Sequence, residues 1–169
     1  PCRAHRSPLT VHVRWATVSD AREVARLLHD FNTEYDTHSP GVDVLTARLA
    51  ELLAAGSTTA LLAGDPAEPA VAVALLTSRP NVWYDGPVLL LDELYVVPHL
   101  RGRGIGTAVV ERLLHDAAAD GVALVEVDVD EPDVDARRFY ERHGFTSGED
   151  PPRERAFYYS RELRPPIGA

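Results

Sequence analysis

The chain has 169 residues, a formal net charge of −9, and a content of 45% hydrophobic and 25% charged residues, which is typical of a globular domain. Its single cysteine, Cys2, excludes an internal disulfide, and its acidic balance argues against sequence-independent binding to nucleic acid. No apolar run is long enough for a membrane helix, so we expect a cytoplasmic protein. We expect residues 1–10 to be a flexible leader, residues 11–163 to be one domain and residues 164–169 to be a tail.

The first half of the chain predicts a strand, two helices and two more strands. Alternating apolar residues indicate a strand over residues 11–16, and Ser19 is the expected N-cap of the helix that follows. Asp43 is expected to cap a second helix, which ends at Gly56. The next strands are expected at residues 58–63 and 70–76.

The second half alternates strands with helices. Residues 88–97 are almost continuously apolar, which is typical of a strand buried on both faces in the middle of a sheet. The remaining expected elements are a helix over about 104–119, a buried strand over 122–129, a helix over 133–143 and a final strand over 156–163. The order, β-α-α-β-β-β-α-β-α-β-β, describes an α/β fold with a mixed sheet of about six or seven strands and helices on both faces.

A glycine-rich turn before the long helix is the most informative stretch. It reads Arg101-Gly102-Arg103-Gly104-Ile105-Gly106-Thr107. Glycines let backbone N–H groups converge, and a helix N-terminus carries partial positive charge, so the turn is a candidate site for phosphate groups. The side chains of Arg101 and Arg103 favour the same ligand, since guanidinium pairs well with phosphate oxygens.

Three other interpretations of this turn can be compared with phosphate binding by its main chain. A Walker phosphate loop is excluded because no Gly-Lys-Ser/Thr follows. A dinucleotide-binding loop is a closer rival, with Asp128 as a ribose ligand, but Thr107 stands where its third glycine belongs. A tight turn that uses glycines only to reverse the chain is the third interpretation.

Two motifs in the right order resemble the GNAT superfamily of N-acetyltransferases. Arg101-x-x-Gly104-x-Gly106 matches the family's cofactor motif Arg/Gln-x-x-Gly-x-Gly/Ala, and residues 94–98 resemble the strand ending that precedes it. Residues 136–145 are similar to the family's Asn-x-x-Ala-x-x-Phe/Leu-Tyr-x-x-x-Gly-Phe, with Asp133 in place of the asparagine. The element order over residues 11–163 also fits, so the resemblance covers nearly all of the chain and implies a GNAT-like fold.

The resemblance implies that acetyl-CoA, the acyl donor, lies in a gap where the parallel strands 88–97 and 122–129 separate. Main-chain groups of residues 94–97 would bind the pantetheine and polarise the thioester carbonyl, and amides of residues 101–107 would bind the diphosphate. The residues so implied in cofactor binding are Leu94, Tyr95, Val96, Val97, Arg101, Gly102, Arg103, Gly104, Ile105, Gly106, Thr107, Asp133, Ala136, Phe139 and Tyr140. No metal is expected, since no ligand cluster has a recognisable spacing.

The resemblance also implies direct transfer in a ternary complex. Tyr140 matches the family tyrosine beside the thioester sulfur, and a phenol is a reasonable proton donor to a departing thiolate. Glu93 and Asp92 are candidate general bases, because burial of a carboxylate in an apolar strand raises its pKa. Strand alternation places the two on opposite faces, but the family tends to bulge this strand. Glu93 is therefore favoured only narrowly over Asp92, and the base can also be neither.

The resemblance implies that the acceptor amine binds near the first two helices, their connection and the loop before the central strand. Aromatic residues interleave with carboxylates in these segments, namely Phe31, Tyr35, Trp83 and Tyr84. Such surroundings suit a cation with some apolar surface, although ordinary surface loops carry the same residue types. Together with the resemblance, the sequence thus predicts an N-acetyltransferase acting on a primary amine of a small molecule or peptide, without nucleic acid or membrane as partner. The resemblance also implies a homodimer as one expected state. The alternatives are a non-catalytic acyl-CoA-binding sensor on the same fold and a nucleotide-dependent oxidoreductase.

Overall fold

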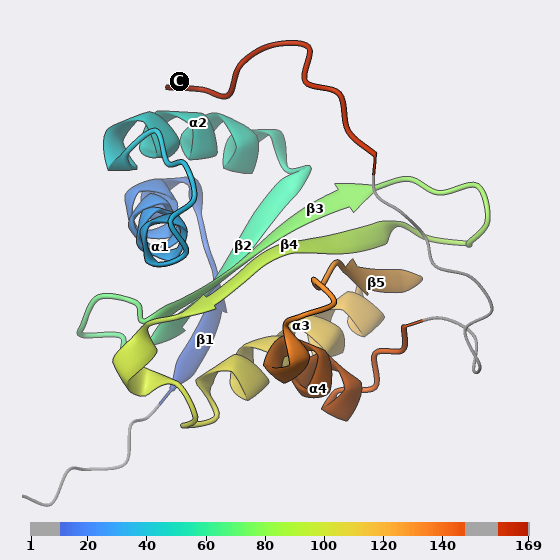
Figure 1. Ribbon diagram of the computed structural model, residues 1–169. Coiled ribbons are helices and arrows are strands. Elements are labelled where there is room, and N and C mark those ends of the chain that lie inside the picture. The colour runs from blue at the N-terminus through green and yellow to red at the C-terminus, as the bar shows by residue number, and fades with distance from the viewer. Residues whose placement is uncertain (1–10, 148–158, 169) are drawn as a thin grey trace, which may run out of the picture. The chain divides into compact units, whose positions relative to one another are not determined.

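The computed structural model describes residues 11–147 and 159–168 (Figure 1). The chain divides into two compact units, the first ending at Val127 and the second beginning at Asp128. The first unit contains β1 (His12–Trp15), a 3-10 turn η1 (Val18–Asp20), α1 (Ala21–Glu34), α2 (Val42–Ala55), β2 (Thr58–Gly64), β3 (Ala72–Arg79), β4 (Val88–Val96), a 3-10 turn η2 (Pro98–Leu100), α3 (Ile105–Ala119) and β5 (Leu124–Val127). The second unit contains α4 (Val134–Arg142). The leader expected over residues 1–10 lies outside the described residues.

The five strands form one mixed sheet in the order β1-β2-β3-β4-β5. Neighbours pair antiparallel from β1 to β4, whereas β4 and β5 pair in parallel. The expected α/β fold is confirmed, with fewer strands than expected in the described residues. Of the final strand expected over 156–163, the first three residues are outside the description, and residues 159–163 are irregular. Tyr159 and Leu163 are 89% and 84% exposed there, so these side chains have no buried face that would favour a strand.

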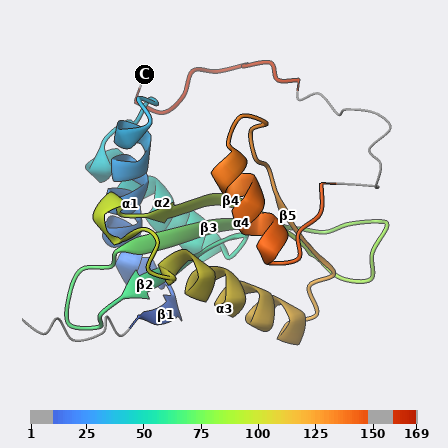
Figure 2. The same cartoon turned by 60° about the horizontal axis from the view of Figure 1, so that its bottom comes forward.

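Helices cover both faces of the sheet, with α1 and α2 on one face and α3 on the other (Figures 1 and 2). Side chains alternate along each strand, so neighbouring residues belong to different layers. Leu62 and Val73 lie in a buried cluster with Leu27 of α1, while α3 packs on β2, β3 and β4 from the opposite face. Burying each leucine contributes about 2 kcal/mol of hydrophobic stabilisation, which holds the helices to the sheet.

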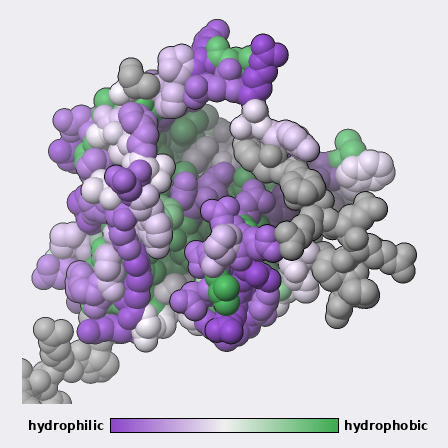
Figure 3. Space-filling model, in the orientation of Figure 1, coloured by the Kyte–Doolittle hydropathy of each residue, from purple (hydrophilic) through white to green (hydrophobic). Residues whose placement is uncertain are grey.

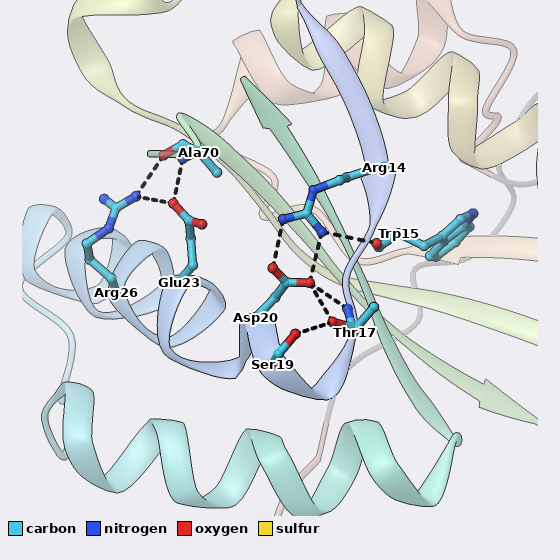
Figure 4. A network of polar contacts seen from close by, with 8 residues as sticks. All are labelled: Arg14, Trp15, Thr17, Ser19, Asp20, Glu23, Arg26 and Ala70. Carbon is cyan, nitrogen blue, oxygen red and sulfur yellow. Dashed lines mark hydrogen bonds and ion pairs between the residues drawn. The ribbon is translucent and has the colours of Figure 1, made fainter. Parts of the chain in front are cut away.

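A polar network fixes the start of α1 (Figure 4). Arg14 donates two hydrogen bonds to the carboxylate of Asp20, at 2.8 and 2.7 Å, and the main-chain N–H of Thr17 donates to the same group at 2.7 Å. These bonds, the one from Arg14 above all, hold the pKa of Asp20 far below its usual range. The expectation that Ser19 caps α1 is wrong, because η1 precedes the helix and Asp20 stands at the N-cap.

The two ends of α2 differ in how well the sequence predicts them. Gly56 ends the helix in a left-handed conformation (φ +79°), as expected from its lack of a side chain. Asp43 is not the N-cap, because Gly41 takes that position with a φ of +94°, which an aspartate adopts less readily. Asp43 lies instead in the first turn, where its carboxylate accepts a hydrogen bond from Arg22 at 2.8 Å.

Candidate active site

The glycine-rich turn leads from η2 into α3. Gly102 and Gly104 have φ values of +73° and +80°, a region that residues with a Cβ enter only at a cost. Gly104 is the N-cap of α3. Among the described residues, no side chain accepts a capping hydrogen bond from the first amides of this helix. The first amides of α3 therefore have no side-chain acceptor and are open to water or a ligand, since a helix cannot bond them itself. The residues present fit a diphosphate group, which accepts hydrogen bonds from such amides.

The side chain of Arg101 points back into the protein. Its Nε donates to the carbonyl oxygen of Val96 at 2.9 Å, and its Nη1 and Nη2 donate to the carboxylate of Glu34 at 2.6 and 2.7 Å. The guanidinium also lies 5.5 Å from the ring centroid of Tyr95. All three nitrogens are thus used internally, so the expected pairing of this guanidinium with phosphate does not fit the structure. The main chain of Arg101 still belongs to the turn.

A β-bulge lies in the middle of β4. Glu93 pairs with Leu75 and Leu91 pairs with Leu76, so Asp92 is an extra residue on β4 between two consecutive partners on β3. The hydroxyl of Thr77 donates to Asp92 Oδ2 at 2.6 Å. Asp92 is exposed, whereas Glu93 is partly buried.

The bulge places both carboxylates on one face of the sheet. Leu75 and Thr77 are two residues apart on β3 and therefore share a face. Glu93 lies opposite Leu75 and Asp92 is bonded to Thr77, so the opposite faces expected from simple alternation are wrong here. Leu75 packs against the cluster that includes α1, which identifies the shared face as the one that α1 and α2 cover.

The two carboxylates differ in their electrostatic surroundings. Burial raises the pKa of Glu93 above its usual value, and the nearby charge of Asp92 raises it further. A carboxylate with a raised pKa holds a proton more readily than an exposed one. Such a group suits general base catalysis near neutral pH.

The parallel strands β4 and β5 pair only over a short stretch. Their register runs from Val88 opposite Leu124 to Leu91 opposite Val127, where β5 ends. The bulge follows at once, and β4 continues to Val96. The strand expected over 122–129 is thus shorter, and its residues are partly rather than fully buried. The end of pairing next to the bulge is where the expected gap between these strands would begin.

Main-chain groups near the end of β4 are partly engaged within the protein. The carbonyl oxygen of Val96 accepts from Arg101, and the amide of Val97 donates to Val71 at 3.0 Å. The side chain of Tyr95 is buried in the core and stacks on Phe31, with 5.3 Å between ring centroids. Tyr95 can therefore offer a cofactor only its main chain, and Leu94 is the partly buried residue between Glu93 and Tyr95.

The second unit holds the remaining predicted cofactor residues on or next to α4. Asp133 caps this helix by accepting a hydrogen bond from the amide of Ala136 at 2.9 Å, so its side chain serves the helix itself. Tyr140 is buried and makes edge-on ring contacts with Phe139 and Phe145, with centroids 5.2 and 5.4 Å apart. These contacts set the orientation of the phenol within its unit.

The four aromatic residues predicted to bind the acceptor lie in two places. Phe31 and Tyr35 are in edge-on contact at the end of α1, with centroids 5.1 Å apart, and Phe31 in turn stacks on Tyr95. Trp83 and Tyr84 lie in the loop between β3 and β4, where Trp83 is 85% exposed. Figure 3 shows that one face of the molecule is mostly hydrophilic, with hydrophobic residues in separate patches. Trp83 and Tyr84 are 85% and 48% exposed, so both side chains are accessible to a ligand.

Glu34 and Thr77 make two contacts in this region, with Arg101 and Asp92, that the sequence analysis did not predict. Their partners are 67 and 15 residues away in the chain, so no local motif connects them. Within residues 11–147 and 159–168, no group of three or more His, Cys, Asp or Glu side chains could hold a metal ion. No helix in this part of the chain is both long and apolar enough to span a membrane.

Comparison with known proteins matches most of the chain to one family. A family model described as the acetyltransferase (GNAT) family matches residues 22–145. A crystal structure of a provisionally assigned acetyltransferase from Arthrobacter sp. FB24 is 49% identical, with a TM-score of 0.80 over 90% of this chain and 96% of that one. An aminoglycoside N-acetyltransferase solved with CoA is 17% identical with a TM-score of 0.72, over 94% of this chain and 99% of that one, and shows the same fold.

Two curated relatives match shorter segments. A mycothiol acetyltransferase of Beutenbergia cavernae is 40% identical over 69 residues, which is 39% of this chain. A GCN5-like protein acetyltransferase of Mycobacterium tuberculosis is 41% identical over 56 residues, which is 33% of this chain. The matches span only 23% and 27% of the lengths of these relatives.

Proposed function

Because the chain belongs to the acetyltransferase (GNAT) family, we propose that it transfers the acetyl group of acetyl-CoA to a primary amine of a small molecule or peptide. The observation that carries this proposal is the uncapped start of α3 behind Gly102 and Gly104, which follows the part of β4 that continues beyond its pairing with β5. Amides of residues 101–107 would bind the diphosphate, and main-chain groups of Leu94 and its neighbours would bind the pantetheine. Acetyl-CoA supplies an activated thioester carbonyl when bound.

Glu93 is the proposed general base. It is partly buried, its pKa is raised, and the bulge turns it toward the face that carries α1 and α2. Phe31, one of the proposed acceptor contacts, stacks on Tyr95 two residues beyond Glu93. An amine held near Phe31 and Tyr35 would thus reach the carboxylate that removes its proton. Asp92 is the weaker candidate, because it is exposed and its carboxylate is already bonded to Thr77.

Tyr140 is the proposed general acid. The amine nitrogen attacks the thioester carbon, the carbon–sulfur bond breaks, and the electron pair leaves on sulfur as a thiolate. Glu93 takes the proton that the attacking amine loses, and the phenol of Tyr140 gives a proton to the thiolate. The products are an acetamide and free CoA. The contacts of Tyr140 with Phe139 and Phe145 would hold the phenol in one orientation for this step.

A panel of acceptors with detection of the free CoA thiol tests this proposal. The names of the relatives include both a protein acetyltransferase and acetyltransferases of small molecules, so the panel should contain peptides, aminoglycosides, amino acids and polyamines. We expect at least one amine to release thiol in proportion to the product formed. Saturable binding of CoA with no turnover on any amine would favour a non-catalytic acyl-CoA sensor. Binding of NAD(P) without binding of acetyl-CoA would favour an oxidoreductase.

A further inference from the structure

We propose that Glu34 is a positioning residue for the acetyl-CoA site, and that it acts by fixing Arg101 at the start of the glycine-rich turn. Glu34 is the last residue of α1. Arg101 lies much later in the chain, directly after η2, which follows the end of β4. The inference rests on the proposed function, because it assigns a role to residues around the proposed diphosphate site. Glu34 itself has no place in the motifs that suggested that site.

The contacts of Arg101 join three elements. Its Nη1 and Nη2 reach the two carboxylate oxygens of Glu34 at 2.6 and 2.7 Å, a bidentate arrangement that fixes direction as well as distance. Its Nε reaches the carbonyl oxygen of Val96 at 2.9 Å. The side chain therefore connects the end of β4 and the end of α1 with the first residue of the turn.

Glu34 is held from a second side by Tyr95. The Tyr95 hydroxyl donates a hydrogen bond to the Glu34 carboxylate, and the Tyr95 ring is buried in the core against Phe31. Arg101, and to a smaller extent Tyr95, keep the pKa of Glu34 below its usual value. The carboxylate is therefore ionised at neutral pH, and both of its oxygens accept from Arg101.

The residues after Arg101 explain why such a fixed point matters. Gly102 and Gly104 lack side chains, and a Cβ placed on either would meet no atom within 4 Å, so no side-chain packing restricts these two residues. Glycine loses more conformational freedom on ordering than any other residue. A ligand that orders this turn must therefore offset that entropy, and anchoring the residue before the first glycine reduces the cost. Losing the anchor should weaken binding of CoA without altering the reacting groups.

The test compares binding of CoA with thermal stability in two matched variants. Glu34→Gln removes the charge of the pair, and we expect it to raise the Kd for CoA about fivefold, the loss associated with a partly exposed ion pair. Asp20→Asn breaks the other bidentate pair of α1, with Arg14, at 2.8 and 2.7 Å. The exposed fractions of the arginines are similar, 40% for Arg101 and 44% for Arg14. We expect Asp20→Asn to lower Tm and to leave the Kd for CoA unchanged.

Two further variants separate a positioning role from a general loss of structure. Glu34→Asp keeps the charge, and we expect it to recover part of the affinity that Glu34→Gln loses. In an Arg101→Gln background, Glu34→Gln should add no further loss, because both substitutions break the same contact. An unchanged Kd in Glu34→Gln, or an equal change in Asp20→Asn, would overturn the positioning role. Wild-type protein that fails to bind CoA would instead overturn the donor site, and the positioning role with it.

Discussion

The hydroxyl of Thr77 on β3 donates a 2.6 Å hydrogen bond to the carboxylate of Asp92, the extra residue in the bulge of β4. This bond holds Asp92 over β3 on the same face as Glu93. Two like charges close together favour the protonated form of the more buried one. Thr77 and Asp92 thereby influence the proton affinity of Glu93 without being the proposed base.

Substitution of each carboxylate should assign the base. We expect Glu93→Gln to lower kcat by about 10²-fold or more, the range for loss of a general base. Asp92→Asn should lower kcat far less, because its amide still accepts from Thr77 and Glu93 remains. The measurement is thiol release at saturating acetyl-CoA for both variants. Equal losses in the two would contradict the distinction between them.

The pH profile should depend on Asp92. The base must be unprotonated to accept a proton, so kcat/KM falls as pH decreases through the pKa of Glu93, which burial and Asp92 both raise. Asp92→Asn removes one of these causes and lowers that pKa, so the acidic limb should move to lower pH. Asp43→Asn, which removes an exposed carboxylate at the start of α2, is the control and should leave the limb in place. A limb that stays fixed in Asp92→Asn would argue against Glu93 as the titrating group.

Two glycines with nearly the same φ allow a matched test of the turn. Gly104 and Gly56 have φ values of +80° and +79°, and a Cβ on either would meet no atom within 4 Å. Alanine at each should therefore destabilise the fold by about 1 kcal/mol through backbone strain alone. Only Gly104→Ala should also weaken binding of CoA, because only Gly104 begins α3. Thermal unfolding and calorimetry measure the two effects, and equal affinities in both variants would speak against the turn as the diphosphate site.

Tyr140→Phe tests the proposed acid. The ring and its contacts with Phe139 and Phe145 are retained, so we expect little change in the affinity for acetyl-CoA. Loss of the proton donor should lower kcat by about 10²-fold. Steady-state kinetics with an identified amine gives both quantities. Turnover at the wild-type rate would remove the role assigned to Tyr140.

Local patterns predicted most of the fold. The apolar run of β4, the glycine at the end of α2 and the glycine-rich start of α3 are features of short segments, and the sheet and helices formed as those patterns indicate. Ser19 and Asp43 were wrong as caps because Asp20 and Gly41 stand at those positions instead. A cap depends on the backbone angles of one residue, and several polar residues near a helix start satisfy the same pattern.

The candidate site was predictable only in part. The motifs point to the turn and to β4, but the bulge that brings Asp92 and Glu93 to one face arises from pairing with β3. The use of the Arg101 guanidinium also depends on a distant partner, since Glu34 lies 67 residues earlier in the chain. A sequence pattern reports which groups are present, whereas the partner of each long side chain is decided by packing.

Titration of acetyl-CoA into the purified protein by calorimetry tests the central claim most directly, because the acceptor need not be known. The account predicts saturable binding with one site per chain, with weaker binding in Gly104→Ala and unchanged binding in Gly56→Ala. The absence of heat and of saturation at millimolar acetyl-CoA would contradict it.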